Sequence, residues 1–226
     1  MLPTETRVLA DTEVVAAEAC RLISAAAVEA IAQRQVFRLV LAGGNTPGRA
    51  YELLAATSQN WAAWEIFWGD ERCLPADDPA RNSRLAQTLW LDRVPIPAGQ
   101  IHPIPAELGV APAAAKYAEV ILGKQPFDLV LLGMGEDGHT ASLFPGAEGQ
   151  AAPVIAIYGA PKSPAERVSL NFQTLRACRK QLIMVTGAEK SAALAAWRQG
   201  VNLPIARAVR SNACLLVDAL ANQSAT

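Results

Sequence analysis

A glycine-rich segment beginning at Gly133 carries the side chains best suited to acid–base chemistry. It reads Gly-Met-Gly-Glu-Asp-Gly-His and follows a short apolar run. A histidine in such a turn can act as a general base near neutral pH, and His139 is one of only two histidines in the chain. Asp137 can orient the imidazole and stabilise its protonated form, as the carboxylate of a catalytic triad does. We predict that His139 and Asp137 are the catalytic pair; the alternative is a histidine that only caps the turn.

The same segment contains the spacing G-x-G-x-x-G, which also occurs in dinucleotide-binding proteins. That fingerprint requires an uninterrupted helix after the glycines and an acidic residue at the end of the next strand. Pro145 and Gly146 end any helix early, and the next predicted strand ends Ile-Tyr-Gly, without an acid. We therefore expect no nicotinamide cofactor, and the sequence indicates no other cofactor.

A second glycine-containing turn, formed by Gly43, Gly44, Asn45 and Thr46, has the features of a phosphate cradle. Glycines let the backbone approach a ligand closely, and the helix predicted to follow offers free N–H groups and the positive end of its dipole. Thr46 adds a hydroxyl group. The turn is not a P-loop, because no Gly-Lys-Ser/Thr follows. The alternative is a tight strand-to-helix turn with Thr46 as the N-cap.

Three cationic residues near predicted strand ends can bind an anion. Arg72, which follows Asp70 and Glu71 after an apolar strand, is suited to bidentate phosphate binding. Asp70 can orient a sugar hydroxyl or hold Arg72 in place. Lys190 falls in the first turn of a predicted helix, where an anionic ligand would offset the unfavourable dipole. Arg167 opens another predicted strand and can reach the same anion. A surface salt bridge and a solvated lysine remain the alternatives for Arg72 and Lys190.

Several other chemistries lack their residue patterns. The chain has no H-x-H, H-E-x-x-H or Cys/His cluster, so we expect no protein-built metal site and an activity that survives a chelator. It has no G-x-S-x-G elbow, and no feature marks Ser142 as a nucleophile. His102, in a proline-flanked loop, is interpreted as structural. The remaining pattern predicts a small phosphorylated substrate and proton-transfer or hydrolytic chemistry.

The elements that must position these groups alternate between strands and helices. Apolar runs predict strands over 36–42, 65–69, 127–133, 154–158, 167–170, 181–186 and 213–217, and helical spacing predicts helices over 12–34, 46–56, 83–91, 112–122 and 189–199. Such alternation favours a single α/β domain over 1–226, Rossmann-like, with a mostly parallel sheet and helices on both faces. The proline-rich segment 93–112 is expected to be a loop. Ligands of such folds bind beyond the carboxyl ends of the strands.

Composition limits the partners and the compartment. The formal net charge is -1 over 226 residues, which gives no electrostatic reason to expect nucleic acid or an anionic membrane as a partner. The four cysteines are widely spaced, which favours a reduced, cytoplasmic compartment. The N-terminus lacks the layout of a signal peptide, and no apolar run approaches the roughly 20 residues of a membrane span.

Five segments together resemble the 6-phosphogluconolactonases, within the family that these enzymes share with glucosamine-6-phosphate deaminases. They are Leu-Ala-Gly-Gly-Asn-Thr-Pro-Gly, Trp-Gly-Asp-Glu-Arg, Asn82-Ser83, the run 127–146 and Val-Thr-Gly-Ala-Glu-Lys, and they occur in family order over almost the whole chain. The resemblance implies the α/β fold of these enzymes and of ribose-5-phosphate isomerase. It also implies hydrolysis of 6-phospho-D-glucono-1,5-lactone to 6-phospho-D-gluconate in the oxidative pentose phosphate pathway.

The resemblance further implies a role for each predicted site residue. His139 would activate water with the support of Asp137, and Arg72 and Lys190 would hold the phosphate beside the turn 43–46. Asp70 would lie near the sugar. A functional association with glucose-6-phosphate dehydrogenase, which makes the substrate, is a further expectation.

One segment departs from the family pattern, and two other functions compete. After residues 167–170 the family usually continues with Pro and later Asn, whereas residues 171–176 read Asn-Phe-Gln-Thr-Leu-Arg, so any role of that loop is in doubt. A glucosamine-6-phosphate deaminase is the first competitor, but that group carries Glu where this chain has Phe144, and Tyr in place of Arg72. The second competitor is a non-catalytic sugar-phosphate sensor, which would not need the pair Asp137 and His139.

Overall fold

The protein is built around a six-stranded sheet in which every neighbouring pair of strands is parallel. The computed structural model describes residues 2–146 and 151–223. The strand order is β1-β9-β8-β5-β2-β3. These strands are β1 (Glu5–Leu9), β2 (Phe37–Leu41), β3 (Trp64–Trp68), β5 (Phe127–Gly133), β8 (Cys178–Val185) and β9 (Cys214–Asp218). A smaller antiparallel sheet has the order β4-β7-β6 and consists of β4 (Asp70–Arg72), β7 (Arg167–Leu170) and β6 (Val154–Ile157).

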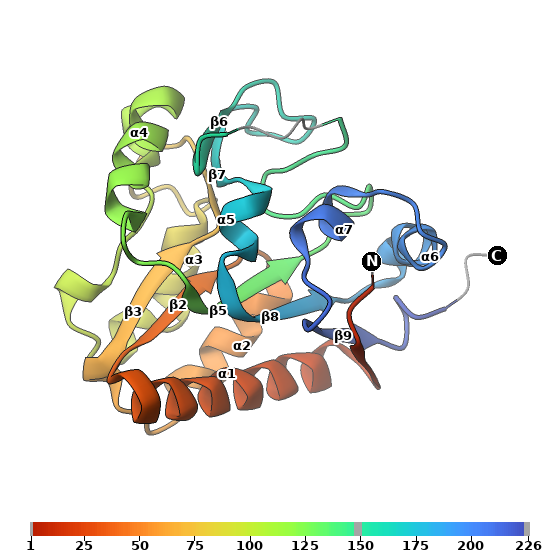
Figure 1. Ribbon diagram of the computed structural model, residues 1–226, viewed down its shortest axis with the longest axis horizontal. Coiled ribbons are helices and arrows are strands. Elements are labelled where there is room, and N and C mark those ends of the chain that lie inside the picture. The colour runs from red at the N-terminus through yellow and green to blue at the C-terminus, as the bar shows by residue number, and fades with distance from the viewer. Residues whose placement is uncertain (1, 147–150, 224–226) are drawn as a thin grey trace.

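Helices cover the sheets from several sides. They are α1 (Thr12–Arg34), α2 (Asn45–Ala55), α3 (Asn82–Leu89), α4 (Val110–Ile121), α5 (Phe172–Arg176), α6 (Ser191–Arg198) and α7 (Pro204–Ala208). Figure 1 shows α1 and α2 below the large sheet, with α5, the small sheet and α4 above it. The helix α4 packs on β6 and β7. Within the described residues, no helix is both long and apolar enough to cross a membrane.

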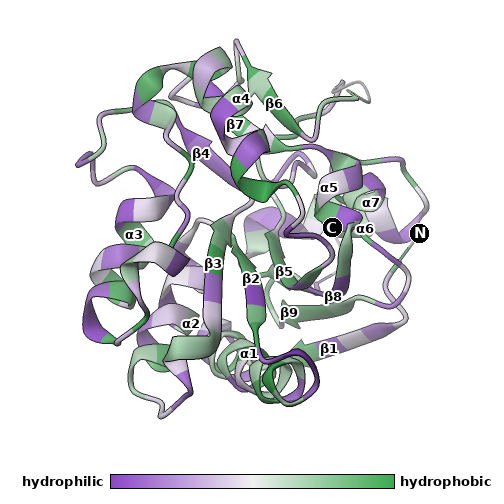
Figure 2. Cartoon of the chain, turned by 60° about the vertical axis from the view of Figure 1, so that its left-hand side comes forward, coloured by the Kyte–Doolittle hydropathy of each residue, from purple (hydrophilic) through white to green (hydrophobic). Residues whose placement is uncertain are grey.

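The helix α1 shows how small side chains bring a helix close to the sheet. Asp11 caps its N-terminus by accepting a hydrogen bond from the Val14 amide at 2.9 Å. Its buried face consists mainly of alanines at helical spacing. This face packs against β2, β5, β8 and β9. Because β5 and β9 are covered on both faces, they are apolar along most of their length, as Figure 2 shows, whereas β8 has the exposed residues Arg179 and Lys180 near its beginning.

One cluster of buried side chains extends through both sheets and the helices around them. The two sheets are joined by Gly69, which links β3 to β4. Its amide donates to the Leu41 carbonyl in the large sheet, at 2.9 Å, and its carbonyl accepts from the Leu170 amide in the small sheet, at 2.8 Å. We therefore propose that the described residues form the single domain that the sequence predicts.

The structure confirms the α/β fold and the mostly parallel sheet, and it corrects several details. The strands predicted at 154–158 and 167–170 exist, but they belong to the separate antiparallel sheet. The short elements β1, β4, α5 and α7 were not predicted, since segments of three to five residues carry little periodicity. The helix expected from Thr46 begins at Asn45, and Gly44 occupies the N-cap position with a φ of 106°. Thr46 is therefore not an N-cap.

The most buried charged group is the carboxylate of Glu71. It accepts hydrogen bonds from the amides of Arg72, Asn82 and Ser83, each at 2.8 Å. Two of these amides open α3, which has no side-chain cap of its own, so Glu71 satisfies the helix N-terminus from a neighbouring strand. Arg81 lies 3.5 Å from the same carboxylate. Glu71 is fully buried, so this charged residue belongs to the core although it closely follows an apolar strand.

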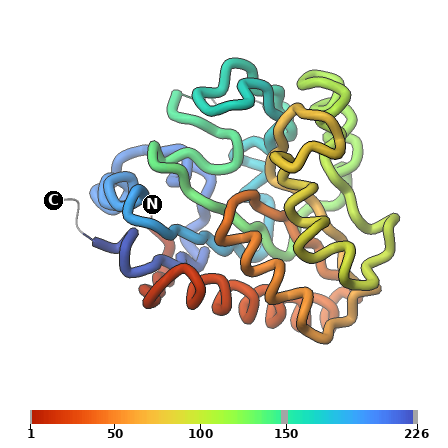
Figure 3. Tube along the Cα trace, turned by 180° about the vertical axis from the view of Figure 1, so that it is seen from behind, coloured from red at the N-terminus to blue at the C-terminus, as the bar shows by residue number. Residues whose placement is uncertain are grey.

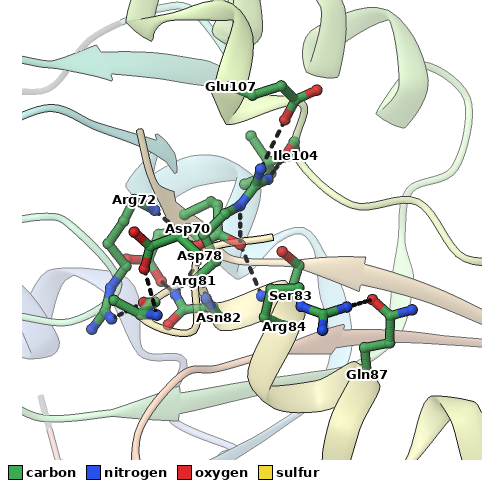
Figure 4. Close-up of polar contacts among 12 residues, drawn as sticks. Asp70, Arg72, Asp78, Arg81, Asn82, Ser83, Arg84, Gln87, Ile104 and Glu107 are labelled. Atoms are coloured by element: carbon green, nitrogen blue, oxygen red, sulfur yellow. Dashed lines mark hydrogen bonds and ion pairs between the residues drawn. The ribbon is translucent and has the colours of Figure 1, made fainter. Parts of the chain in front are cut away.

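Arg81 also links this carboxylate to the segment that contains Ile104 and Glu107. It donates to the Ile104 carbonyl at 2.7 Å and to Glu107 at 2.8 Å (Figure 4). Arg81 is almost fully buried, whereas the side chain of Glu107 is 38% exposed. The two acidic partners of Arg81 therefore lie in different environments, which allows a matched test.

We predict that Glu71→Gln lowers the free energy of unfolding by about 3–5 kcal/mol, because it neutralises a fully buried carboxylate that pairs with Arg81 and accepts three backbone amides. The glutamine amide would also face N–H donors. The matched variant Glu107→Gln should lose about 0–1 kcal/mol, since that pair is partly exposed. Urea unfolding curves of both variants measure the difference. Equal losses in the two variants would contradict this assignment.

Candidate active site

The loops that follow β2, β3, β5 and β8 meet around a cavity of about 290 Å³ at the carboxyl edge of the large sheet. In Figure 3 the segment after β5, in green, lies between the blue segment after β8 and the orange α2. Parallel strands bring these loops to one edge, because the carboxyl end of every strand lies on the same side. Among the residues predicted for the site, Gly43, Gly44, Asp70, Arg72, His139, Arg167 and Lys190 line this cavity.

The remaining predicted residues lie next to this cavity. Asn45 and Thr46 line an adjoining hollow of about 230 Å³, which shares Gly43, Gly44 and Lys190 with the main cavity. The hydroxyl of Thr46 lies 2.6 Å from that of Thr186, at the end of β8. The turn 43–46 therefore borders both hollows and is tied to the strand that precedes Lys190.

His139 and Asp137 are in direct contact. Nδ1 of His139 lies 2.5 Å from Oδ1 of Asp137, and the same oxygen accepts the His139 amide at 3.1 Å. Burial raises the pKa of Asp137, but the hydrogen bonds from the His139 amide and ring outweigh it, so the pKa is lowered overall. The carboxylate thus stays ionised and accepts a hydrogen bond from Nδ1 of His139. The other ring nitrogen, Nε2, is left for proton transfer.

A glycine makes this contact possible. A Cβ atom at position 135 would lie 2.0 Å from Nδ1 of His139 and 2.8 Å from Oδ1 of Asp137. Only glycine therefore leaves room for the ring at this position. On its other side the ring packs against Phe144, with 4.7 Å between ring centroids. The chain after β5 is a turn without a helix through residue 146, unlike a dinucleotide-binding segment.

Asp70 is buried and held by two polar neighbours. Its Oδ2 accepts from the Ser142 hydroxyl at 2.6 Å, and its Oδ1 accepts from the Asn82 amide group at 3.3 Å. Asn82 also donates to the Asp70 carbonyl at 3.0 Å, as Figure 4 shows. Ser142 is fully buried, and Asp70 is the acceptor of its hydroxyl group.

Arg72 and Arg167 lie opposite each other in the register of β4 and β7. Like charges directly opposite in a sheet destabilise it, and an anion between them would remove that cost. Arg72 donates to the Ala80 carbonyl, and its Nε is buried without a partner among the described residues. Arg167 donates instead to the carbonyls of Lys162, Ser163 and Pro164, at 3.0–3.1 Å. Burial lowers the pKa of Arg167, and the charge of Arg72 adds to this effect.

Lys190 ends a short 3-10 turn, Ala188–Lys190, in front of α6 rather than lying within one continuous helix. The turn is anchored by Asp218, a buried carboxylate at the end of β9 that accepts the Gly187 amide at 3.0 Å. The ammonium group of Lys190 lies 3.4 Å from Glu136 and 3.7 Å from Glu189. Lys190 thus has a fixed backbone and two exposed acidic neighbours.

Sequence reasoning assigned no role to several residues that build this site. Glu71 and Asp218 anchor loops from beneath, and no local pattern marks a buried acid. Lys162 lines the cavity from the connection between β6 and β7, a segment that the sequence interpretation left unassigned. The atypical segment 171–176 forms α5 and contributes no residue to the cavity lining. Its departure from the family pattern therefore leaves the predicted pocket intact.

The other histidine and the cysteines lie outside this site. The ring of His102 stacks on Phe67, with centroids 4.8 Å apart, and burial lowers its pKa despite the nearby Glu65. The four cysteines are free thiols, and burial raises the pKa of Cys178 to about 12. Within the described ranges, no group of three or more His, Cys, Asp or Glu side chains could hold a metal ion.

Comparison with known proteins places the chain in a family. A family model described as "Glucosamine-6-phosphate isomerases/6-phosphogluconolactonase" matches residues 10–217. The chain therefore belongs to the glucosamine-6-phosphate isomerase/6-phosphogluconolactonase family. A 6-phosphogluconolactonase of Nostoc sp. is 39% identical over 197 residues, which cover 83% of this chain and 82% of the relative. The 6-phosphogluconolactonase of Mycobacterium tuberculosis is 34% identical over 229 residues, with 92% and 93% covered.

Solved structures show the same fold. The crystal structure of 6-phosphogluconolactonase from Thermotoga maritima superposes with a TM-score of 0.88 at 28% identity, covering 95% of this chain and 98% of that one. A monomeric glucosamine-6-phosphate deaminase superposes with a TM-score of 0.84 at 18% identity, covering 97% and 99%. This second likeness concerns the fold alone.

We predict that Gly135→Ala displaces the His139 ring and removes its hydrogen bond to Asp137. Because the chain has two histidines, imidazole NMR resolves both, and His102 serves as the internal reference. The His139 signals should move while those of His102 stay. Gly99→Ala, at an open position with nothing within 4 Å of the added Cβ, is the matched control. Unmoved His139 signals in Gly135→Ala would refute this packing.

Proposed function

We propose that this protein hydrolyses 6-phospho-D-glucono-1,5-lactone to 6-phospho-D-gluconate, the second step of the oxidative pentose phosphate pathway. The contact between His139 and Asp137, inside a cavity lined by cationic side chains, is the observation that carries this proposal. The names of the relatives, which are 6-phosphogluconolactonases at 32–39% identity over most of the chain, support it.

The proposed chemistry needs one base and no metal. Nε2 of His139 removes a proton from water as the water oxygen attacks the ester carbonyl of the lactone. A tetrahedral oxyanion forms, and the bond from the carbonyl carbon to the ring oxygen then breaks. The imidazolium returns its proton to the leaving ring oxygen, which becomes a hydroxyl group. Asp137 stabilises the imidazolium during this cycle.

The substrate phosphate is proposed to lie between Arg72 and Lys190, beside the turn of Gly43, Gly44, Asn45 and Thr46. The buried, unpartnered Nε of Arg72 and the opposing Arg167 both favour an anion here. Asp70 is proposed to lie near the sugar. Its carboxylate already accepts hydrogen bonds from Ser142 and Asn82, which keep it in one orientation.

The two competing functions fit this cavity less well. A deaminase of this family would use a proton-transferring Glu at position 144, whereas Phe144 packs on the His139 ring and cannot transfer protons. A sensor would not require the close contact between Asp137 and His139. An association with the dehydrogenase that makes the substrate remains a proposal. A protein of Oryctolagus cuniculus named "GDH/6PGL endoplasmic bifunctional protein" contains a segment that is 36% identical to this chain. That segment makes up 23% of the length of the Oryctolagus protein.

The test is lactone hydrolysis by the wild-type protein and by His139→Ala. The lactone is generated freshly from glucose 6-phosphate, and its spontaneous hydrolysis is subtracted. We expect fast turnover by wild type, unchanged by a chelator, and a loss of about 10²–10⁴-fold in the folded variant, as for a general base. An inactive wild type that still binds 6-phosphogluconate would favour the sensor. Activity lost to chelator and restored by metal would overturn the metal-free chemistry.

We predict that Arg72→Ala raises KM by about tenfold or more and lowers kcat much less. The phosphate lies remote from the reacting carbonyl, so Arg72 contributes equally to ground-state and transition-state binding. A charge-assisted hydrogen bond of about 1.5–3 kcal/mol corresponds to such a change in affinity. Steady-state kinetics with the phosphorylated lactone measure both constants. An unchanged KM would refute the placement of the phosphate at Arg72.

A further inference from the structure

Lys162 is a cationic residue of the cavity to which neither the sequence motifs nor the proposed chemistry assigns a role. It lies in the connection between β6 and β7 and lines the same cavity as Arg72, His139 and Lys190. Its ammonium group lies 2.6 Å from Oε1 of Glu136. Glu136 belongs to the turn after β5, whose residue His139 lines the cavity, so this ion pair joins two segments that border the cavity.

Glu136 holds two lysines at once. Its Oε1 pairs with Lys162, and its Oε2 lies 3.4 Å from the ammonium group of Lys190. One carboxylate thus sits between two ammonium groups, with one oxygen directed to each. The hydrogen bond from Lys162, with the backbone amide of Glu136 and the charge of Lys190, lowers the pKa of Glu136 to about 2. The carboxylate is therefore ionised throughout the neutral range.

Arg167 fixes the backbone around Lys162 by hydrogen bonds. The guanidinium group of Arg167 donates to the carbonyls of Lys162, Ser163 and Pro164. Arg167 is itself buried, and its guanidinium carbon lies 5.7 Å from the centroid of the Phe144 ring. A buried guanidinium that binds three successive carbonyls fixes the position of the chain. Arg167 therefore positions the backbone of Lys162 and also places its own charge opposite Arg72.

We propose that Lys162 is a further binding residue for the phosphate of the substrate, and that Glu136 occupies the place of this anion until the substrate arrives. This inference rests on the proposed function, because it assigns the phosphorylated group of that substrate to a second lysine. The phosphate, which Arg72 contacts on its other side, would replace Glu136 as the anionic partner of Lys162 and Lys190, and the carboxylate would turn outward into water.

Exposure and charge favour this exchange. The side chain of Glu136 is 50% exposed and that of Lys162 is 40% exposed, so water screens the ion pair and can solvate the carboxylate when it leaves Lys162. A phosphate monoester carries up to two negative charges and three acceptor oxygens, against one charge and two oxygens for the carboxylate. Two ammonium groups therefore bind the phosphate more strongly than they bind Glu136.

The chain offers a matched ion pair far from the cavity. Lys180 and Glu29 form a lysine–glutamate pair with side-chain exposures of 52% and 48%, and neither residue lines the cavity. Lys162→Met and Lys180→Met therefore remove the same charge from similar environments. Both lysines are exposed enough that neither variant should unfold, and thermal unfolding checks this point.

Binding is measured by calorimetry with two probes, 6-phosphogluconate and inorganic phosphate. We expect Lys162→Met to weaken the binding of both probes by about tenfold, as for one charge-assisted hydrogen bond, and Lys180→Met to change it by less than about twofold. If Lys162→Met binds both probes like Lys180→Met, the proposal is overturned. If wild type binds neither probe, the proposed function fails together with this inference, so the two failures are distinguishable.

Glu136→Gln tests the second half of the proposal. If Glu136 occupies the place of the phosphate, its neutralisation should tighten the binding of both probes by about two- to fivefold, since Coulomb attraction to the lysines no longer competes. Glu29→Gln is the matched control and should leave both affinities unchanged. Weaker binding by Glu136→Gln would mean that the carboxylate positions the lysines instead, and would overturn the exchange.

Discussion

The buried carboxylate of Glu71 is the interaction on which the geometry of the cavity depends. Side chains alternate across a strand, so Asp70 and Arg72 share one face of β4 while Glu71 points to the other. On that inner face Glu71 accepts hydrogen bonds from the first amides of α3 and forms an ion pair with the guanidinium of Arg81. A carboxylate without exposure is stable only when its oxygens are paired in this way. The orientation of Asp70 and Arg72 toward the cavity follows from that requirement.

Acidic side chains that accept backbone amides also anchor the other loops of the site. Asp218 accepts the Gly187 amide beneath the turn that carries Lys190, and Asp137 accepts the amide of His139. Acidic side chains thus anchor the backbone, while the lysines and arginines face the cavity. A chain with a formal net charge of -1 can in this way present a cationic pocket. The arrangement of charges between core and cavity, and not their sum, determines which ligand this surface attracts.

The small antiparallel sheet closes the cavity on the side that the large sheet leaves open. It begins where the chain leaves β3 at Gly69, and it places Arg72 beside Arg167. Arg167 in turn donates hydrogen bonds to three carbonyls of the β6–β7 connection, which contains Lys162. Loops that vary at the rim of a conserved scaffold are where enzymes of one fold acquire different substrates. In this protein the scaffold determines where His139 lies, and the β6–β7 connection adds the cationic side chain of Lys162 to the same cavity.

The sequence by itself determined the class of the fold and several of the residues that face the cavity. Alternating apolar runs and helical segments define a parallel sheet, and the carboxyl ends of its strands locate Gly43, Arg72, His139 and Lys190, because these effects are local or periodic. It did not reveal Glu71 or Asp218 as anchors, the second sheet, or the part played by Lys162. Those depend on contacts between residues distant in the chain, such as Lys162 with Glu136 and Arg72 with Arg167. Only the tertiary structure decides such contacts, since burial and pairing of a charge depend on what the rest of the chain packs around it.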